Sequence, residues 1–179
     1  LVAAGGGGRF GTGWGGDGAR NLSAKRVSAT GRRLYSAAMP SIAFASWLMA
    51  AGASINFMLG LAHLRATYFG SLLHPRDAEL MARMKLVSPR ISSATSVWRA
   101  GIGFNASHSL GAMLFGAIYA YLALAAALLL FGSPFLLGVG LVSLIAKLVL
   151  ARLYWFRVPL VGVGAATLLY VAAMVVSRN

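Results

Sequence analysis

Hydrophobic and polar positions separate the chain into four long apolar segments divided by short polar stretches. The apolar segments cover residues 41–64, 100–131, 134–150 and 159–176. Each reaches or exceeds the roughly 17–25 mostly apolar residues with which a helix crosses the hydrocarbon core of a bilayer. The pattern predicts an all-α polytopic integral membrane protein, a bundle of four transmembrane helices preceded by an extended, basic, glycine-rich arm.

The boundaries of these segments carry helix-end signals. The second segment is longer than a bilayer core requires, so we expect its first turns at the interface or in a tilted helix. "GSP" at residues 132–134 predicts a tight turn with proline at the next helix start. "ARLYWFRVP" separates the last two segments and supplies an interface belt of aromatic and basic side chains, namely Arg152, Tyr154, Trp155 and Arg157. Lys147, near the end of the third segment, is expected to snorkel towards the interface.

Residues 65–99 form the only substantial loop between the apolar segments. Within it, "HPRDAELMARMKLVSP" predicts a short amphipathic helix at about 75–87, with Pro75 in its first turn and Asp77 and Glu79 near the positive end of the helix dipole. Four spans place both termini on one side of the membrane. The basic residues near the span ends favour a loop that faces the matrix, the stroma or the cytoplasm.

Residues 1–40 differ in composition from the rest of the chain. They are rich in glycine, serine and arginine and contain one acid, Asp17. This composition is typical of an organelle transit peptide. Such an arm has too little apolar surface to offset the entropy of ordering its backbone. We expect a flexible or cleaved segment, or an arm laid across a partner protein.

Composition excludes several classes of function. The chain is 59% hydrophobic and 11% charged, against about 25% charged residues in an ordinary soluble domain. It has no cysteine and only three acids, which argues against thiolate chemistry, iron–sulfur clusters, a carboxylate dyad and a carboxylate metal site. The net charge of +13 comes from basic residues that flank apolar segments. Anionic lipid head groups or acidic partner surfaces therefore explain it better than nucleic acid.

Two apolar segments carry polar residues along one helix face. Spacings of three and four residues place two sets on such faces: Gly52, Asn56, Gly60 and His63 in the first segment, and Gly101, Asn105, His108 and Ala112 in the second. Both faces lie towards the loop. We therefore predict an antiparallel helix pair with Asn56, His63, Asn105 and His108 near its seam.

Small residues predict close helix contacts beside these faces. Gly103, Ser107 and Gly111 form a small-residue stripe in the second segment, and Gly162 and Ala166 form a weaker one in the fourth. Small residues at this spacing allow two helix backbones to approach closely.

The polar face of the second segment admits three interpretations. The first is polar packing between helices, with neutral, hydrogen-bonded histidines. The second is a head-group or quinone pocket lined by Arg99, Asn105 and His108. The third is axial ligation of a haem or chlorin by His63 and His108. A zinc site would also need His74, with no acid nearby, so no metal is expected.

Catalysis and transport lack their usual groups. Ser107-His108-Ser109 has no partnering carboxylate and no nucleophile elbow. "GGGGRFGTGWGG" lacks the Gly-Lys-Ser/Thr ending of a phosphate loop. The spans contain no acid and no internal repeat, which argues against ion-coupled transport.

The stretch "WRAGIGFNASHSLGAMLFG" resembles part of a family of small bacterial four-helix membrane proteins. That family carries Trp-Arg…Gly-Phe-Asn-x-Ser-His-Ser-x-Gly at the start of its second span. The likeness covers residues 45–130 and not the arm. It implies the four-helix fold and a role for the motif, and it brings no activity with it.

The sequence thus predicts a non-catalytic accessory subunit of a larger energy-transducing, respiratory membrane complex, which contributes assembly and lipid contacts. The expected location is the mitochondrial inner membrane, with a plastid or bacterial membrane as the alternative. Residues expected to contact lipid or neighbouring helices are Asn56, Arg99, Asn105, Ser107, Arg152 and Arg157. The alternative function is a small carrier or redox protein that binds a lipid, quinone or haem at the Asn105/His108 face, with His63.

Overall fold

The computed structural model describes the backbone of residues 16–178 and the side-chain surroundings of residues 40–178. The chain divides into two compact units, Leu1–Pro40 and Ser41–Asn179. The proposed transit or docking role of the arm falls largely on side chains outside the described part. The first helix, α1 (Gly16–Tyr68), begins well before the predicted residue 41 and contains Pro40. Its early start reflects the alanine, lysine and arginine of residues 19–38, which favour helix.

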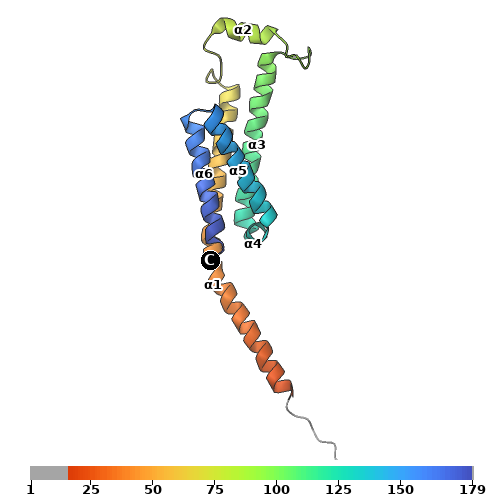
Figure 1. Ribbon diagram of the computed structural model, residues 1–179, viewed down its shortest axis with the longest axis vertical. Helices are drawn as coiled ribbons and strands as arrows, with labels where there is room; N and C mark the ends of the chain where they lie inside the picture. The colour runs from red at the N-terminus through yellow and green to blue at the C-terminus, as the bar shows by residue number, and fades with distance from the viewer. Residues whose placement is uncertain (1–15, 179) are drawn as a thin grey trace, which may run out of the picture. The chain divides into compact units, whose positions relative to one another are not determined.

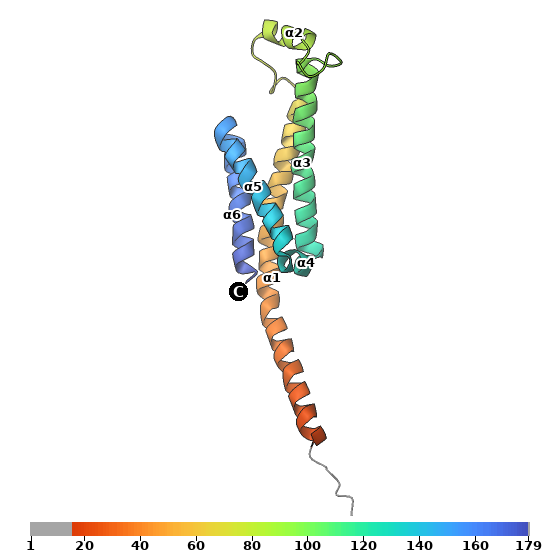
Figure 2. The same ribbon diagram turned by 45° about the vertical axis from the view of Figure 1, so that its right-hand side comes forward.

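Four helices are long and apolar enough to cross a membrane, so the predicted all-α membrane fold is confirmed. They are Pro40–Tyr68 of α1, α3 (Val97–Ala125), α5 (Pro134–Tyr154) and α6 (Arg157–Val176). From residue 41 onward they run side by side (Figures 1 and 2). Large apolar side chains such as Phe44, Leu114 and Leu168 are more than half exposed. Lipid would cover such surfaces in a membrane.

The second predicted segment is interrupted near its end. α3 stops at Ala125, and a short helix, α4 (Ala127–Gly132), follows after Ala126, whose φ of −141° and ψ of 42° are not helical. The predicted turn at residues 132–134 is confirmed. The Ser133 side chain accepts a hydrogen bond from the Leu136 N–H, with proline in the first turn of α5.

The loop helix α2 (Ala78–Leu86) is shorter than predicted. Asp77 is its N-cap and accepts hydrogen bonds from the N–H groups of Glu79 and Leu80 at 2.8 and 3.2 Å. Pro75 therefore precedes the helix, because the carboxylate of Asp77 is the group that satisfies the free N–H donors at a helix start. No side chain of α2 is buried.

Glycines on α1 and α3 bring these two helices into backbone contact, as the helix-face pattern predicted. A Cβ at Gly60 would lie 2.8 Å from the Ser109 carbonyl oxygen and 3.0 Å from the Cβ of Ala112. A Cβ at Gly116 would lie 2.6 Å from the carbonyl oxygen of Ala53. Gly52, which the pattern placed on the same face as Gly60, instead meets α6, where its Cβ would lie 3.0 Å from the Ala166 carbonyl oxygen.

The prediction that Gly103, Ser107 and Gly111 close a helix contact is wrong for this chain. All three residues are exposed, and a Cβ added at either glycine would meet nothing within 4 Å. The Ser107 hydroxyl donates to the Phe104 carbonyl of its own helix at 2.9 Å. The inward face of α3 instead carries four buried small residues: Ala106, Ser109, Ala112 and Gly116. Both faces repeat small residues at helical spacings of three or four, so spacing alone did not separate them.

Candidate functional site

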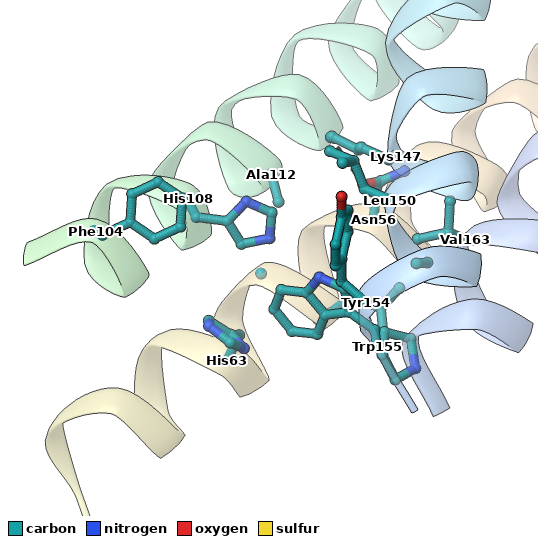
Figure 3. A pocket seen from close by; sticks show the side chains of 14 residues that line it. Asn56, His63, Phe104, His108, Ala112, Lys147, Leu150, Tyr154, Trp155 and Val163 are labelled. Atoms are coloured by element: carbon teal, nitrogen blue, oxygen red, sulfur yellow. Dashed lines mark hydrogen bonds between the residues drawn. The ribbon is translucent and has the colours of Figure 1, made fainter. Parts of the chain in front are cut away.

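A pocket of about 350 Å³ lies between α1, α3, α5 and α6, at the end of the bundle where α1 runs into the loop. Its wall is mainly aliphatic and aromatic. The polar side chains that line it are Asn56, His63, His108, Lys147, Tyr154 and Trp155. Figure 3 shows His108 directed from α3 towards Trp155, and Lys147 beside Asn56. α1, α3 and α5, with the Trp155 cap of α5, thus place amide, imidazole, ammonium and indole groups around one space, and α6 adds apolar wall.

Asn56 and Lys147 form the polar base of the pocket. Lys147 Nζ donates a hydrogen bond to Asn56 Oδ1 at 3.2 Å across 91 residues of sequence. A lysine ammonium only donates, so this bond fixes which way the Asn56 amide points. Asn56 is 1% exposed, and its Nδ2 has no hydrogen-bond partner among residues 40–178. The pocket therefore contains a buried donor that lacks an acceptor.

Lys147 turns into the bundle, and the prediction that it snorkels to the interface is wrong. Its Nζ lies 4.5 Å from the centre of the Phe115 ring. Lys147 is seven residues before Tyr154, about 10 Å inside the end of α5 at the rise of a helix. The side-chain oxygen of Asn56 and the face of the Phe115 ring both attract the ammonium, which therefore points into the bundle.

No carboxylate balances the charge of Lys147 within residues 41–178. Glu79 lies 3.7 Å from Arg83, and Asp77 caps α2 in the loop. The third acid, Asp17, belongs to the first unit of the chain. A lysine near the centre of a membrane helix costs about 2.5–3.5 kcal/mol on insertion scales. Such a residue is therefore a strong indication of a functional site.

Two histidines and a tryptophan line the pocket nearer the loop. The ring centres of His63 and His108 are 5.6 Å apart, and Trp155 lies 5.2 Å from His63 and 5.5 Å from His108. His63 Nε2 is 3.4 Å from Asn105 Oδ1. The predicted meeting at the α1–α3 seam is thus confirmed for His63, Asn105 and His108, whereas the fourth predicted residue, Asn56, bonds Lys147 of α5.

The structure separates the remaining predicted site residues from the pocket. Asn105 lies behind His63 and does not line it, and Arg99 is exposed and contributes its backbone N–H to the Ser96 cap of α3. Arg152 and Arg157 are exposed at the loop-side ends of α5 and α6. Ser107 faces outward from α3. Only His63, His108 and Asn56 of the predicted set line the pocket.

Sequence reasoning missed the contribution of α5 and its end. Lys147, Tyr154 and Trp155 line the pocket but were interpreted as interface residues. Lys147 carried the usable signal, because it is the charged residue farthest from the end of any span. No signal in the sequence placed Trp155 beside the two histidines.

The arrangement of the histidines does not fit a haem. A macrocycle held by both rings would extend at right angles to the line that joins them. Trp155 lies at nearly equal distances from both rings and therefore occupies that plane. Within the described residues, no three His, Cys, Asp or Glu side chains are close enough to hold a metal ion together.

Comparison with protein-family models, curated proteins and solved structures finds no match for this chain. The resemblance to bacterial four-helix membrane proteins therefore stays a prediction. What the fold defines is an integral membrane protein with four candidate spans.

Proposed function

We propose that this protein binds an amphipathic small molecule, a lipid or a quinone, in the pocket between α1, α3, α5 and α6. The observation that carries the proposal is the base of that pocket. There, among residues 40–178, Lys147 has no carboxylate partner and Asn56 Nδ2 lacks an acceptor. Polar donors at the end of an otherwise apolar cavity are typical of sites that orient a ligand by its head group.

The edges of the pocket give an apolar chain a route out. Phe104, Leu150 and Tyr154 line the pocket and are exposed on the outside of the bundle. α5 leans away from α3 towards the loop end in both views (Figures 1 and 2). An acyl or isoprenoid tail would therefore leave between α3 and α5 and remain in the hydrocarbon region.

The test is the amount of small molecule that co-purifies with the protein. Leu150→Trp fills the pocket edge, and Val149→Trp is the matched control, because Val149 is also about half exposed but does not line the pocket. We expect mass spectrometry of solvent extracts to find a lipid or quinone bound near one per chain in the natural protein and in Val149→Trp. Leu150→Trp should lose most of it. Equal amounts in all three proteins would contradict the proposal.

A second candidate function is the accessory subunit of an energy-transducing, respiratory complex. Its support is the outward stripe of Gly103, Ser107 and Gly111, beside a shallow apolar depression formed by residues such as Phe57 and Leu114. A helix of another subunit fits such a surface closely. The organelle-like composition of residues 1–40 favours the mitochondrial inner membrane, with plastid and bacterial membranes as alternatives.

Native electrophoresis of gently solubilised membranes tests the subunit function. Gly111→Leu should release the protein from a larger complex and leave the extracted small molecule unchanged. Migration of the natural protein as a monomer would contradict it.

A further inference from the structure

We infer that the head group bound in this pocket is an oxyanion, the carboxylate or phosphate of a membrane amphiphile, held by Lys147 Nζ and Asn56 Nδ2. The inference rests on the proposed function and narrows it from lipids and quinones to anionic amphiphiles, because a neutral quinone would not balance the charge of Lys147. It depends on three features of the pocket: charge, donor direction and depth.

Charge is the first feature. Lys147 is enclosed by α1, α3 and α5, where its contacts are the Asn56 carbonyl and the face of Phe115. Both are dipolar partners, and neither neutralises a full positive charge. The two acids of residues 41–178 are in α2 and its cap. A partly buried charge without a counter-charge is unfavourable, so an anionic ligand would remove a desolvation cost that a neutral ligand leaves.

Donor direction is the second feature. The Asn56 Oδ1 is occupied by Lys147, which leaves the Nδ2 of the same amide as a free donor in a side chain that is 1% exposed. One ammonium N–H is used by Asn56 and two remain. Asn56 and Lys147 therefore hold unused N–H donors beside their shared bond, and these outnumber the one acceptor position left on Asn56 Oδ1. Oxyanion oxygens accept several such bonds at once, and charge-assisted bonds of this kind are roughly twice as strong as neutral ones.

Depth is the third feature. Lys147 stands two helical turns inside the end of α5, in a pocket whose wall includes the apolar side chains Leu59, Ala112 and Val163. Electrostatic attraction is stronger in such apolar surroundings than in water. An exposed surface lysine would distinguish an acid from its ester only weakly. Lys147 is placed to distinguish them strongly.

The experiment compares acids with neutral molecules of the same chain length. Protein in nanodiscs of phosphatidylcholine is titrated with palmitic acid, methyl palmitate and phosphatidic acid, and bound ligand is measured by native mass spectrometry. We expect the acid to bind about tenfold or more tightly than its ester, as one or two charge-assisted hydrogen bonds imply. Preference for palmitic acid over phosphatidic acid identifies a free carboxylate as the ligand, and the reverse identifies a lipid phosphate.

Variants assign the preference to the residues. Lys147→Met keeps the length of the side chain without its charge and should bind acid and ester equally. Lys147→Arg should keep a preference for the acid. Lys85→Met is the control, since Lys85 is an exposed lysine of α2 outside the spans, and it should behave as the natural protein does.

The outcomes separate this inference from the proposed function. If neither acid nor ester binds but a lipid or quinone co-purifies with the natural protein, the oxyanion inference is wrong and the proposed function stands; if nothing co-purifies either, the proposed function fails. If both bind equally, the pocket binds amphiphiles and the oxyanion inference is wrong. That comparison needs no variant, so it holds even if a substitution disturbs folding. A tenfold preference that persists in Lys147→Met would also overturn the inference.

Discussion

Single glycines decide how closely α1 and α3 approach. Gly60 and Gly116 lie where any Cβ would meet backbone of the facing helix, whereas Gly103 and Gly111 lie on the outer face of α3 with open space around them. Helix packing in membranes depends on such close contacts, because lipid tails remove most of the hydrophobic driving force. A glycine is therefore required for packing on the inner face of α3, whereas a larger residue would fit on its outer face.

We predict that Gly116→Ala lowers the stability of the bundle and that Gly111→Ala does not. The added methyl at residue 116 would lie 2.6 Å from the Ala53 carbonyl oxygen and 2.8 Å from the Phe57 nitrogen, so the helices must separate. Overpacking of this kind costs about 1–3 kcal/mol. Thermal unfolding in detergent should show a lower midpoint for Gly116→Ala. An unchanged midpoint would show that α3 does not meet α1 at this point.

At the scale of elements, α2 is a helix defined by its cap. It buries no side chain, and Asp77 supplies the hydrogen bonds to its first N–H groups. The predicted helix at 75–87 was correct in kind and began too early. Proline at residue 75 and aspartate at residue 77 are both signals of a helix start. The helix begins after the aspartate because its side chain accepts hydrogen bonds from the first free N–H groups.

We predict that Asp77→Ala unfolds α2 locally without destabilising the bundle. Loss of an N-cap costs about 1 kcal/mol, which is large for a nine-residue helix without buried contacts. Hydrogen exchange of residues 78–86 should accelerate severalfold, while the thermal midpoint stays the same. Asp77→Asn keeps the capping oxygen and serves as the control. A large fall in the midpoint would show that α2 supports the bundle.

At the scale of the whole molecule, four spans place the loop and the C-terminus on opposite sides of the membrane. The chain contains no cysteine, so single introduced cysteines report the topology directly. We predict that Ser92→Cys in the loop and Arg178→Cys at the C-terminal end react with an impermeant maleimide from opposite faces of sealed vesicles. Both positions reacting from one face would exclude the four-span arrangement.

Local sequence was enough to predict the four spans, the turn at residues 132–134 and the part of the α1–α3 seam near His63. These features follow from local quantities: the apolar length that a bilayer requires and the periodicity of a helix. The residues of that shared face, including His63 and Asn105, could be predicted because one loop joins the two helices and sets them antiparallel.

Long-range packing determines which small-residue face of α3 is covered, that Lys147 points inward and that Trp155 contacts both histidines. Each depends on helices far apart in sequence, as the bond between Lys147 and Asn56 across 91 residues shows. A lysine near a span end reaches either the interface or the interior with the same local sequence. The neighbouring helix decides which direction the lysine takes, because that helix supplies or lacks a hydrogen-bond acceptor for the ammonium.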